Sequence, residues 1–276
     1  MKPWPVYTLL LILMSSASAY DLINSRSGGL GRSVLLSHPS ATDLVNSPTD
    51  ALVHNAALFD MGYDRRFELA DLDNLFIAGG WQYRRWTVAL GLSQFGRTDL
   101  YAEQLIKGSV VLHYREFALG LMPSAMQIQF GNGYGSLRAA TFGLGAGYSG
   151  YDFKVSMVSD NLTRPRFVDN GDRTGMTFTL LTEYHGHRAF SLLGRLQAEP
   201  TQKPQFGLGQ WIRLSGRSAF FWGVAGEPTE YGGGLEIEIP FGAITYAASV
   251  HPVLGLSHTV SLTYRPARRS GEDDFD

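Results

Sequence analysis

The regular alternation of apolar and polar residues constrains the fold of this chain more than any other feature. In the segment 85–93, Trp86, Val88, Leu90 and Leu92 would face one way and smaller residues the other. The same period of two returns in segment after segment as far as residue 265. Successive side chains of a strand point to opposite faces, so the pattern predicts many strands with one apolar and one polar face. Helical periodicity is confined to the segment Ser47–Phe59.

The joints between these segments favour antiparallel hairpins. Six joints separate two alternating runs by only a few residues: Arg84-Arg85, Arg115-Glu116, Ser149-Gly150, Gly186-His187, Gly216-Arg217 and Gly226-Glu227. Longer loops are expected at Phe95–Ile106, Gly131–Leu137 and Asn161–Arg173. Short turns that alternate with longer loops are typical of an outer-membrane barrel, whose short turns lie on the periplasmic side. We predict about 12 to 14 strands of about ten residues, the length with which a tilted strand crosses a bilayer.

The N-terminus has the pattern of an export signal. Lys2 precedes the apolar run Val6–Met14, and the small residues Ser15–Ala19 come before Tyr20. A charged start, a short apolar core and an A-x-A cleavage site indicate a secretory signal peptide. We therefore predict a signal peptide at residues 1–19, a barrel domain at 20–265 and a polar tail at 266–276.

Two architectures fit an exported chain with this alternation. In a secreted β-sandwich the apolar face would be a buried core, whereas in a membrane barrel it would meet lipid. The polar faces carry charged residues that can be paired or hydrated in a lumen: Lys154, Glu183, Arg195, Arg213, Glu236 and Glu238. Aromatic residues gather near strand ends, where the interface girdles of a barrel would lie: Tyr83, Trp86, Tyr114, Tyr148, Tyr184 and Tyr264 among them. We therefore predict an all-β, antiparallel transmembrane barrel with a short N-terminal helical segment and with outer-membrane lipid as its partner.

Composition excludes several classes of function. Charged residues are 17% of the chain, less than the quarter or so that is usual in soluble proteins, and the net charge is −2. A charge so near zero gives no sign of a nucleic-acid partner. The chain contains no cysteine, which excludes disulfides and thiolate chemistry.

A glycine motif in the middle of the chain raises the question of a dinucleotide site. Gly145, Gly147 and Gly150 form a G-x-G-x-x-G match, but the motif needs a helix directly after it. Tyr151–Met157 instead alternates with a period of two, which predicts a hairpin. Gly143, Gly145 and Gly147 then share one face, where the wall bends or a neighbour approaches closely.

No arrangement of residues indicates catalysis or a metal site. A serine nucleophile needs a histidine base and a third group that orients it. Ser249 and His251 could share a strand face, but no orienting residue is near them in the sequence. His185-Gly186-His187 has metal-ligand spacing but falls in an expected turn. We predict no catalytic residue, no metal and no cofactor.

Three stretches of the chain carry a resemblance to a known family: "DALVHNAALF" (50–59), "YDFKVSMVSDNLTRP" (151–165) and "HPVLGLSHTVSLTYR" (251–265). They resemble segments of the PorV/PorQ family of outer-membrane proteins and of the related FadL fatty-acid transporters. The first departs from the family pattern, with Ala56 in place of a proline and Leu58 in place of a glycine. The resemblance implies a barrel commonly of about fourteen strands with its N-terminal segment near the lumen. It also implies either uptake of hydrophobic compounds or service in type IX secretion.

The sequence leads to a first expectation about function and to two alternatives. Lumen charges at Arg195, Arg213, Glu236 and Glu238, without an evident apolar stretch beside them, favour a secretion-accessory or protein-binding barrel. Such a barrel would bind secretion-system proteins. The first alternative is a FadL-like transporter of small hydrophobic compounds, gated by Ser47–Phe59 with His54 and Asn55. The second alternative is a barrel hydrolase, for which no nucleophile and base are found.

Overall fold

The computed structural model describes residues 22–48, 57–131, 135–167, 173–187, 189–200 and 202–265. The predicted signal peptide (1–19), the tail (266–276) and the gate residues His54 and Asn55 lie outside them. Most of the first family-like stretch, 50–59, lies outside them as well.

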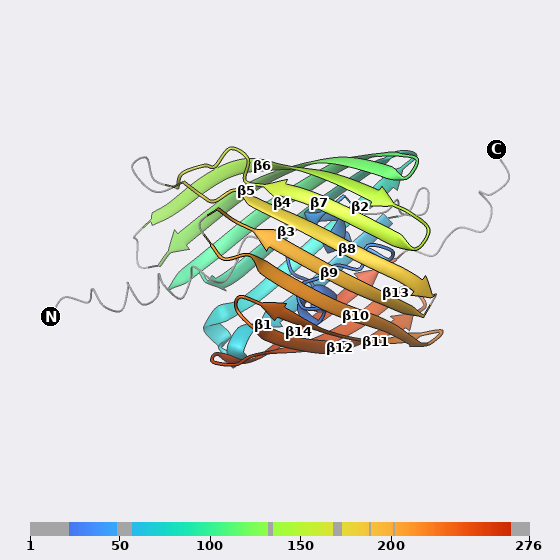
Figure 1. Ribbon diagram of the computed structural model, residues 1–276. Coiled ribbons are helices and arrows are strands. Elements are labelled where there is room, and N and C mark those ends of the chain that lie inside the picture. Colours follow the sequence, from blue (N-terminus) through green and yellow to red (C-terminus); the bar gives the residue numbers. More distant parts are fainter. Residues whose placement is uncertain are drawn as a thin grey trace.

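Fourteen antiparallel strands form one closed barrel, in which each strand pairs with the next along the chain and β1 pairs with β14 (Figure 1). They are β1 (Ala57–Arg65), β2 (Asp73–Tyr83), β3 (Trp86–Arg97), β4 (Tyr101–Tyr114), β5 (Phe117–Phe130), β6 (Gly135–Ser149), β7 (Phe153–Asp160), β8 (Thr177–His187), β9 (Phe190–Ala198), β10 (Gln205–Ser215), β11 (Ser218–Gly226), β12 (Glu230–Ile239), β13 (Gly242–His251) and β14 (Gly255–Tyr264). The predicted all-β barrel is confirmed. The sandwich alternative is wrong, because the register from Phe59 opposite Tyr264 to Arg65 opposite His258 closes the sheet.

The two ends of the barrel differ in their connections. One end, the tight-turn end, carries the short turns at 84–85, 115–116, 216–217 and 240–241. The other, the loop end, carries the 3-10 segments η1 (Arg66–Glu68) and η2 (Ala70–Leu72) and the long connection from 161 to 176. One expectation about connections is wrong: Phe95–Ile106 is mostly strand, because β3 and β4 stay paired as far as Arg97 opposite Tyr101. The short joint expected at Gly226-Glu227 is confirmed, since β11 ends at Gly226 and β12 begins at Glu230, and it lies at the loop end.

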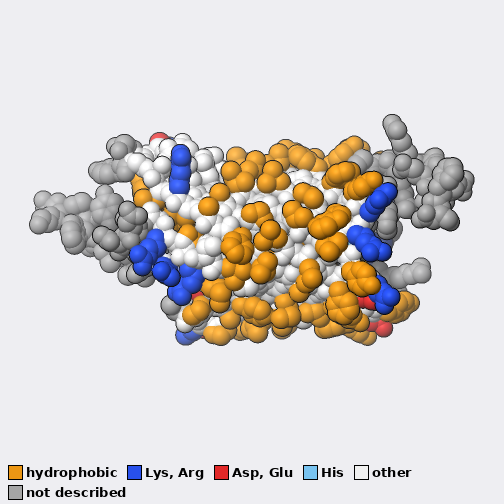
Figure 2. All heavy atoms as spheres, turned by 90° about the horizontal axis from the view of Figure 1, so that it is seen from above, with side chains coloured by type: hydrophobic (Ala, Val, Ile, Leu, Met, Phe, Trp, Pro, Cys, Tyr) orange, Lys and Arg blue, Asp and Glu red, His pale blue; other side chains and the backbone are white. Residues whose placement is uncertain are grey.

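The barrel is apolar outside and polar inside. Large apolar side chains of every strand are exposed and form a band around the barrel (Figure 2), among them Ile77, Leu90, Leu119, Leu144, Met157, Leu208, Ile237 and Val260. Polar side chains of the same strands are buried toward the lumen, among them Asp60, Gln82, Lys107, Ser156, Glu183 and Glu236. A band of this kind is the lipid-facing surface of a membrane barrel.

The predicted short N-terminal helical segment is confirmed: among the described residues, the helices α2 (Ser25–Gly29) and α3 (Ala41–Asn46) precede the barrel. Within Ser47–Phe59, Ser47 is extended and Ala57–Phe59 begin β1, while most of the segment lies outside the described residues. Ser40 and Asp43 form a capping box, which starts α3 at Ala41. Within the part of the chain that is described, no helix is long and apolar enough to cross a membrane.

Residues 22–48, which we call the plug, lie inside the barrel. In Figure 1 they are the blue segment enclosed by the strands. Helix α2 contacts β11 to β14, and α3 contacts β1 to β4. The two helices therefore contact the wall on both sides of the β1–β14 pairing.

Replacing Leu90 with arginine should destabilise the barrel by about 2–4 kcal/mol, the cost of an arginine near the bilayer midplane. The free energy of unfolding is measured by denaturant titration of protein refolded into vesicles. Leu100→Arg is the matched control, because Leu100 is 53% exposed, against 54% for Leu90, but lies in the turn between β3 and β4. Equal losses in the two variants would contradict a lipid-facing band.

Candidate functional site

Glycines in the wall let the plug backbone lie directly against the strands. A methyl group added at Gly209 of β10 would lie 2.8 Å from the Leu30 carbonyl oxygen, and one at Gly232 of β12 would lie 2.9 Å from that of Gly29. Such distances are too short for any side chain, so only glycine fits at these positions. The plug contributes its own glycine, Gly31, whose φ of +63° takes the chain through a left-handed turn.

Two glycines of the central G-x-G-x-x-G match, Gly145 and Gly147, have the same role. A methyl group at Gly145 would lie 2.7 Å from Cδ of Pro48, and one at Gly147 would lie 2.6 Å from the Pro48 carbonyl oxygen. The predicted hairpin is confirmed, with Ser149 at the end of β6 and Phe153 at the start of β7. The close neighbour that the glycines accommodate is the end of the plug.

Beneath the plug, the inner wall carries two apolar patches. The first apolar patch lies on β1 to β5 and consists of Leu58, Phe76, Ala78, Ala89, Leu105 and Met126. Plug residues Leu22, Ala41, Leu44 and Val45 cover it. The second apolar patch lies on β9 to β13 and consists of Leu193, Trp211, Ala219, Phe221 and Ala247. Leu30 and Leu35 of the plug cover it. The expectation that the lumen has no apolar stretch is therefore wrong.

A buried ion pair anchors α2 to the wall. Arg26 donates from Nε to Glu236 Oε2 over 3.0 Å, and both side chains are 5% exposed. Arg26 also donates from Nη1 to the His38 carbonyl oxygen over 2.7 Å, and Thr245 donates to Glu236 over 3.2 Å. A pair with such extra hydrogen bonds can offset part of its desolvation cost, but a single partner left behind would be a buried charge.

A second anchor is built around Glu183, which is fully buried. Its two carboxylate oxygens accept from the Ser37 backbone N–H at 2.7 Å and from the Ser37 hydroxyl at 2.6 Å. Ser191 donates to the same carboxylate over 2.8 Å, and His185 Nδ1 lies 2.8 Å from the Ser191 hydroxyl. Ser191 is itself fully buried, so this group of polar residues holds the plug.

The structure gives no support to a metal site at His185. Among the residues that the structure describes, no group of three or more His, Cys, Asp or Glu side chains is placed to hold a metal ion. The side chain of His187, the second histidine of the His185-Gly186-His187 pair, lies outside the described part. The absence of a metal stays a prediction.

Asp43 is a buried acid at the start of α3. Its carboxylate accepts from the Ser40 N–H at 2.9 Å and from Asn24 Nδ2 at 3.1 Å. Burial raises the pKa of Asp43 from 3.8 to about 6, with Arg26 opposing and Asp60 adding to the rise. Asp60 of β1 accepts from the Thr42 N–H over 2.9 Å and so ties α3 to the wall as well.

The four predicted lumen charges do not form one site. Glu236 meets Arg26 of the plug, a partner that sequence reasoning missed. Arg213 and Glu238 lie 3.8 Å apart and are 38% and 37% exposed. Arg195 is buried elsewhere, beside a small cavity between plug and wall. All four face the lumen as expected, while a role for them in binding remains a prediction.

Among the described residues, the cavities found between plug and wall are small. The cavity at Arg195 has a volume of about 50 Å³ and is also lined by Leu22, Ile23, Asp43 and Val158. Another, at the loop end beside Arg32 and Phe67, has about 90 Å³. Such volumes hold a few water molecules. Passage of a larger molecule at these two places therefore requires the plug to move.

Comparison with known proteins shows a likeness of fold. No protein-family model matches the chain, and no curated protein sequence matches it. Among solved structures, the Ralstonia pickettii toluene transporter TbuX superposes with a TM-score of 0.64 at 12% identity, over 90% of this chain and 99% of that one. The Pseudomonas putida toluene transporter TodX has a TM-score of 0.61 at 9% identity, over 89% and 98%. The CymD monoaromatic hydrocarbon channel has a TM-score of 0.60 at 12% identity, over 91% and 99%.

These likenesses correct the first expectation about function. The similar structures are transporters of hydrophobic compounds, and they give nothing in favour of PorV/PorQ or of type IX secretion. The secretion-accessory interpretation is therefore wrong, and the first alternative fits better. Transport channels as neighbours agree with the prediction that the chain is not an enzyme, which stays a prediction.

The anchor at Glu236 can be tested by a mutant cycle. Arg26→Ala should weaken plug docking by about 3–5 kcal/mol, because it leaves a buried carboxylate unpaired. The double variant Arg26→Met with Glu236→Met should regain most of this loss, since no buried charge remains. The probe is the emission of Trp211, which is 2% exposed and packs against Leu30 and Leu35 of the plug, followed in a denaturant titration. Equal losses in the single and double variants would contradict a docked ion pair.

Docking of the plug should also depend on pH through Asp43. Because the pKa of Asp43 is raised in the docked state, the docked plug holds the Asp43 proton more tightly than the free plug does. The stabilisation of docking by this proton is complete below pH 3.8 and is lost as the pH rises to about 6. The difference in docking free energy between wild type and Asp43→Asn should change by about 3 kcal/mol across this window. Trp211 emission measured from pH 3.5 to pH 7 tests it. A difference that stays constant with pH would disprove the assignment.

Proposed function

We propose that the chain is a channel for small hydrophobic compounds in the outer membrane of a bacterium, with the lumen as its path. The observation that carries this proposal is the pair of apolar patches on the inner wall, which plug residues cover, joined at the first patch by Phe167 of the connection between β7 and β8. Transport of ions or polar solutes would not require apolar patches on the inner wall. The predicted export signal, the lipid-facing band and the likeness in fold to toluene and monoaromatic hydrocarbon transporters support it.

The free energy gained by burying apolar area against the patches is large enough to bind a compact apolar ligand. An aromatic molecule that buries about 150–250 Å² gains about 4–6 kcal/mol at 25 cal/mol per Å². About 5.5 kcal/mol of preferential binding converts a state that is 1% populated into one that is 99% populated. A molecule of this size that replaces Leu44 and Val45, or Leu30 and Leu35, can therefore compete with the plug for the wall.

Expression of the chain should accelerate the uptake of a radiolabelled monoaromatic hydrocarbon such as toluene. The measurement compares cells that carry the chain in their outer membrane with cells that lack it, at a ligand concentration low enough for permeation to limit the rate. A small hydrophilic solute is the control, because the docked plug leaves it no path. Unchanged hydrocarbon uptake would contradict the proposal.

A disulfide lock tests whether the plug must move, and because the chain contains no native cysteine no other disulfide can form. Cβ atoms at Pro48 of the plug and Gly120 of β5 would lie 3.5 Å apart. This distance falls within the range of about 3.5–4.5 Å found in disulfides.

In the oxidised state, Pro48→Cys with Gly120→Cys should abolish uptake, and reductant should restore it. The two single-cysteine variants are the controls. Full uptake with the lock oxidised would rule out a route through the lumen that requires the plug to move.

A further inference from the structure

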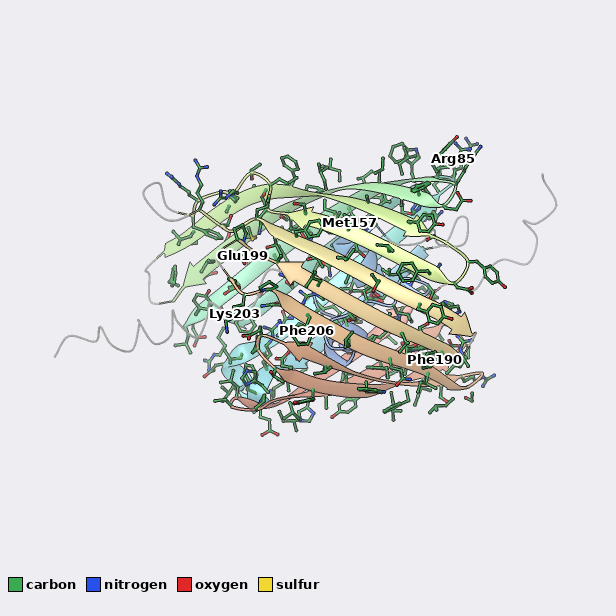
Figure 3. All side chains as sticks on the ribbon, in the orientation of Figure 1. Arg85, Met157, Phe190, Glu199, Lys203 and Phe206 are labelled. Atoms are coloured by element: carbon green, nitrogen blue, oxygen red, sulfur yellow. The ribbon has the colours of Figure 1, made fainter. Side chains whose placement is uncertain are left out.

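Two neighbouring hairpin turns at the tight-turn end bring three arginines together on the outer rim. Arg84 and Arg85 form the turn between β2 and β3, and Arg115 lies in the turn between β4 and β5. The His113 N–H donates to the Arg85 carbonyl oxygen over 2.8 Å and so holds the two turns side by side. Figure 3 marks Arg85 at this end of the barrel, and Figure 2 shows basic side chains just beyond the apolar band.

The three guanidinium groups rest on exposed tyrosines. The Cζ atoms of Arg85 and Arg115 lie 5.7 Å and 5.6 Å from the centre of the same ring, that of Tyr114. Arg84 lies 5.3 Å from the ring of Tyr83 in the same way. Both tyrosines are about half exposed, at 46% for Tyr83 and 55% for Tyr114. The rings orient the charges without neutralising them.

These arginines have no carboxylate partner among the described residues, although Glu116 lies in the second turn. The loop end differs. There Arg65 pairs with Asp73 over 3.0 Å, and Arg97 pairs with Asp71 over 2.9 Å and with Asp99 over 2.6 Å. Positive charge is thus left open at these two turns, whereas Arg65 and Arg97 at the loop end are paired.

We propose that Arg84, Arg85 and Arg115, set on Tyr83 and Tyr114, bind the phosphate headgroup of an anionic phospholipid. A guanidinium matches phosphate oxygens with two parallel hydrogen bonds, and aromatic rings at this level contact the glycerol and the upper acyl chain. Short turns face the periplasm in outer-membrane barrels, so the lipid belongs to the periplasmic leaflet. This site lies on the outer rim and does not depend on transport through the lumen.

Native mass spectrometry of the detergent-solubilised mature chain, titrated with phosphatidylglycerol, tests the site. Phosphatidylcholine is the reference, because it has the same phosphate but no net charge. The wild type should bind the first phosphatidylglycerol more tightly than phosphatidylcholine, and Arg85→Gln with Arg115→Gln should bind it about thirtyfold more weakly. Heat-modifiable migration on a gel confirms that each variant is folded.

The charge-matched control is Arg138→Gln with Arg217→Gln, which removes two exposed arginines without a tyrosine contact and should change the affinity less than twofold. If the first double variant does not fold, Tyr114→Leu provides the test, with an expected loss of about fivefold. Equal loss in the control pair would show diffuse electrostatic attraction and overturn the site. So would equal affinity for the two lipids, or displacement of the lipid by millimolar inorganic phosphate.

Discussion

The rest of the structure depends on the pairing of β1 with β14. In a bilayer no water is present to satisfy backbone groups, and each unpaired N–H or C=O on an open sheet edge would cost several kcal/mol. The register from Phe59 opposite Tyr264 to Arg65 opposite His258 removes both edges at once. Closure also turns the two faces of the sheet into an outside and an inside. Only then can Leu90 meet lipid while Glu183 is buried in the lumen.

A closed wall with buried polar groups needs partners in its interior, and the plug supplies them. The plug combines two kinds of contact. Glycines such as Gly209 and Gly145 bring the backbones together, and around these approaches apolar side chains cover the patches. Charged and polar anchors at Glu236 and Glu183 then fix the register of the plug. The apolar contacts supply most of the attraction, while the anchors give orientation, because buried ion pairs add little net stability.

The sequence predicted the strands of the barrel wall but not the plug inside it. Alternation predicts the strands because lipid and lumen impose opposite polarity on neighbouring residues, and it placed Arg213, Glu236 and Glu238 correctly toward the inside. It failed where both faces are apolar, as at Phe76 between Leu75 and Ile77, and so it missed the patches. It also failed for contacts across long sequence separations, since no local pattern links Ser37 to Glu183. Sequence reasoning also missed α3 at Ala41, because the apolar spacing in 47–59 outweighed the capping box at Ser40.

The arrangement of anchors and patches implies which molecules can open the barrel. A ligand shifts a two-state equilibrium only by the difference in its affinity for the two states. The patches are covered while the plug is docked, so an apolar molecule can bind them only after the plug has moved, and its binding free energy therefore favours the open state. An ion or sugar gains nothing at Phe76 or Phe221 and leaves the equilibrium unchanged. In the channel that we propose, selectivity for apolar compounds would then follow from the plug itself, without a filter of fixed width.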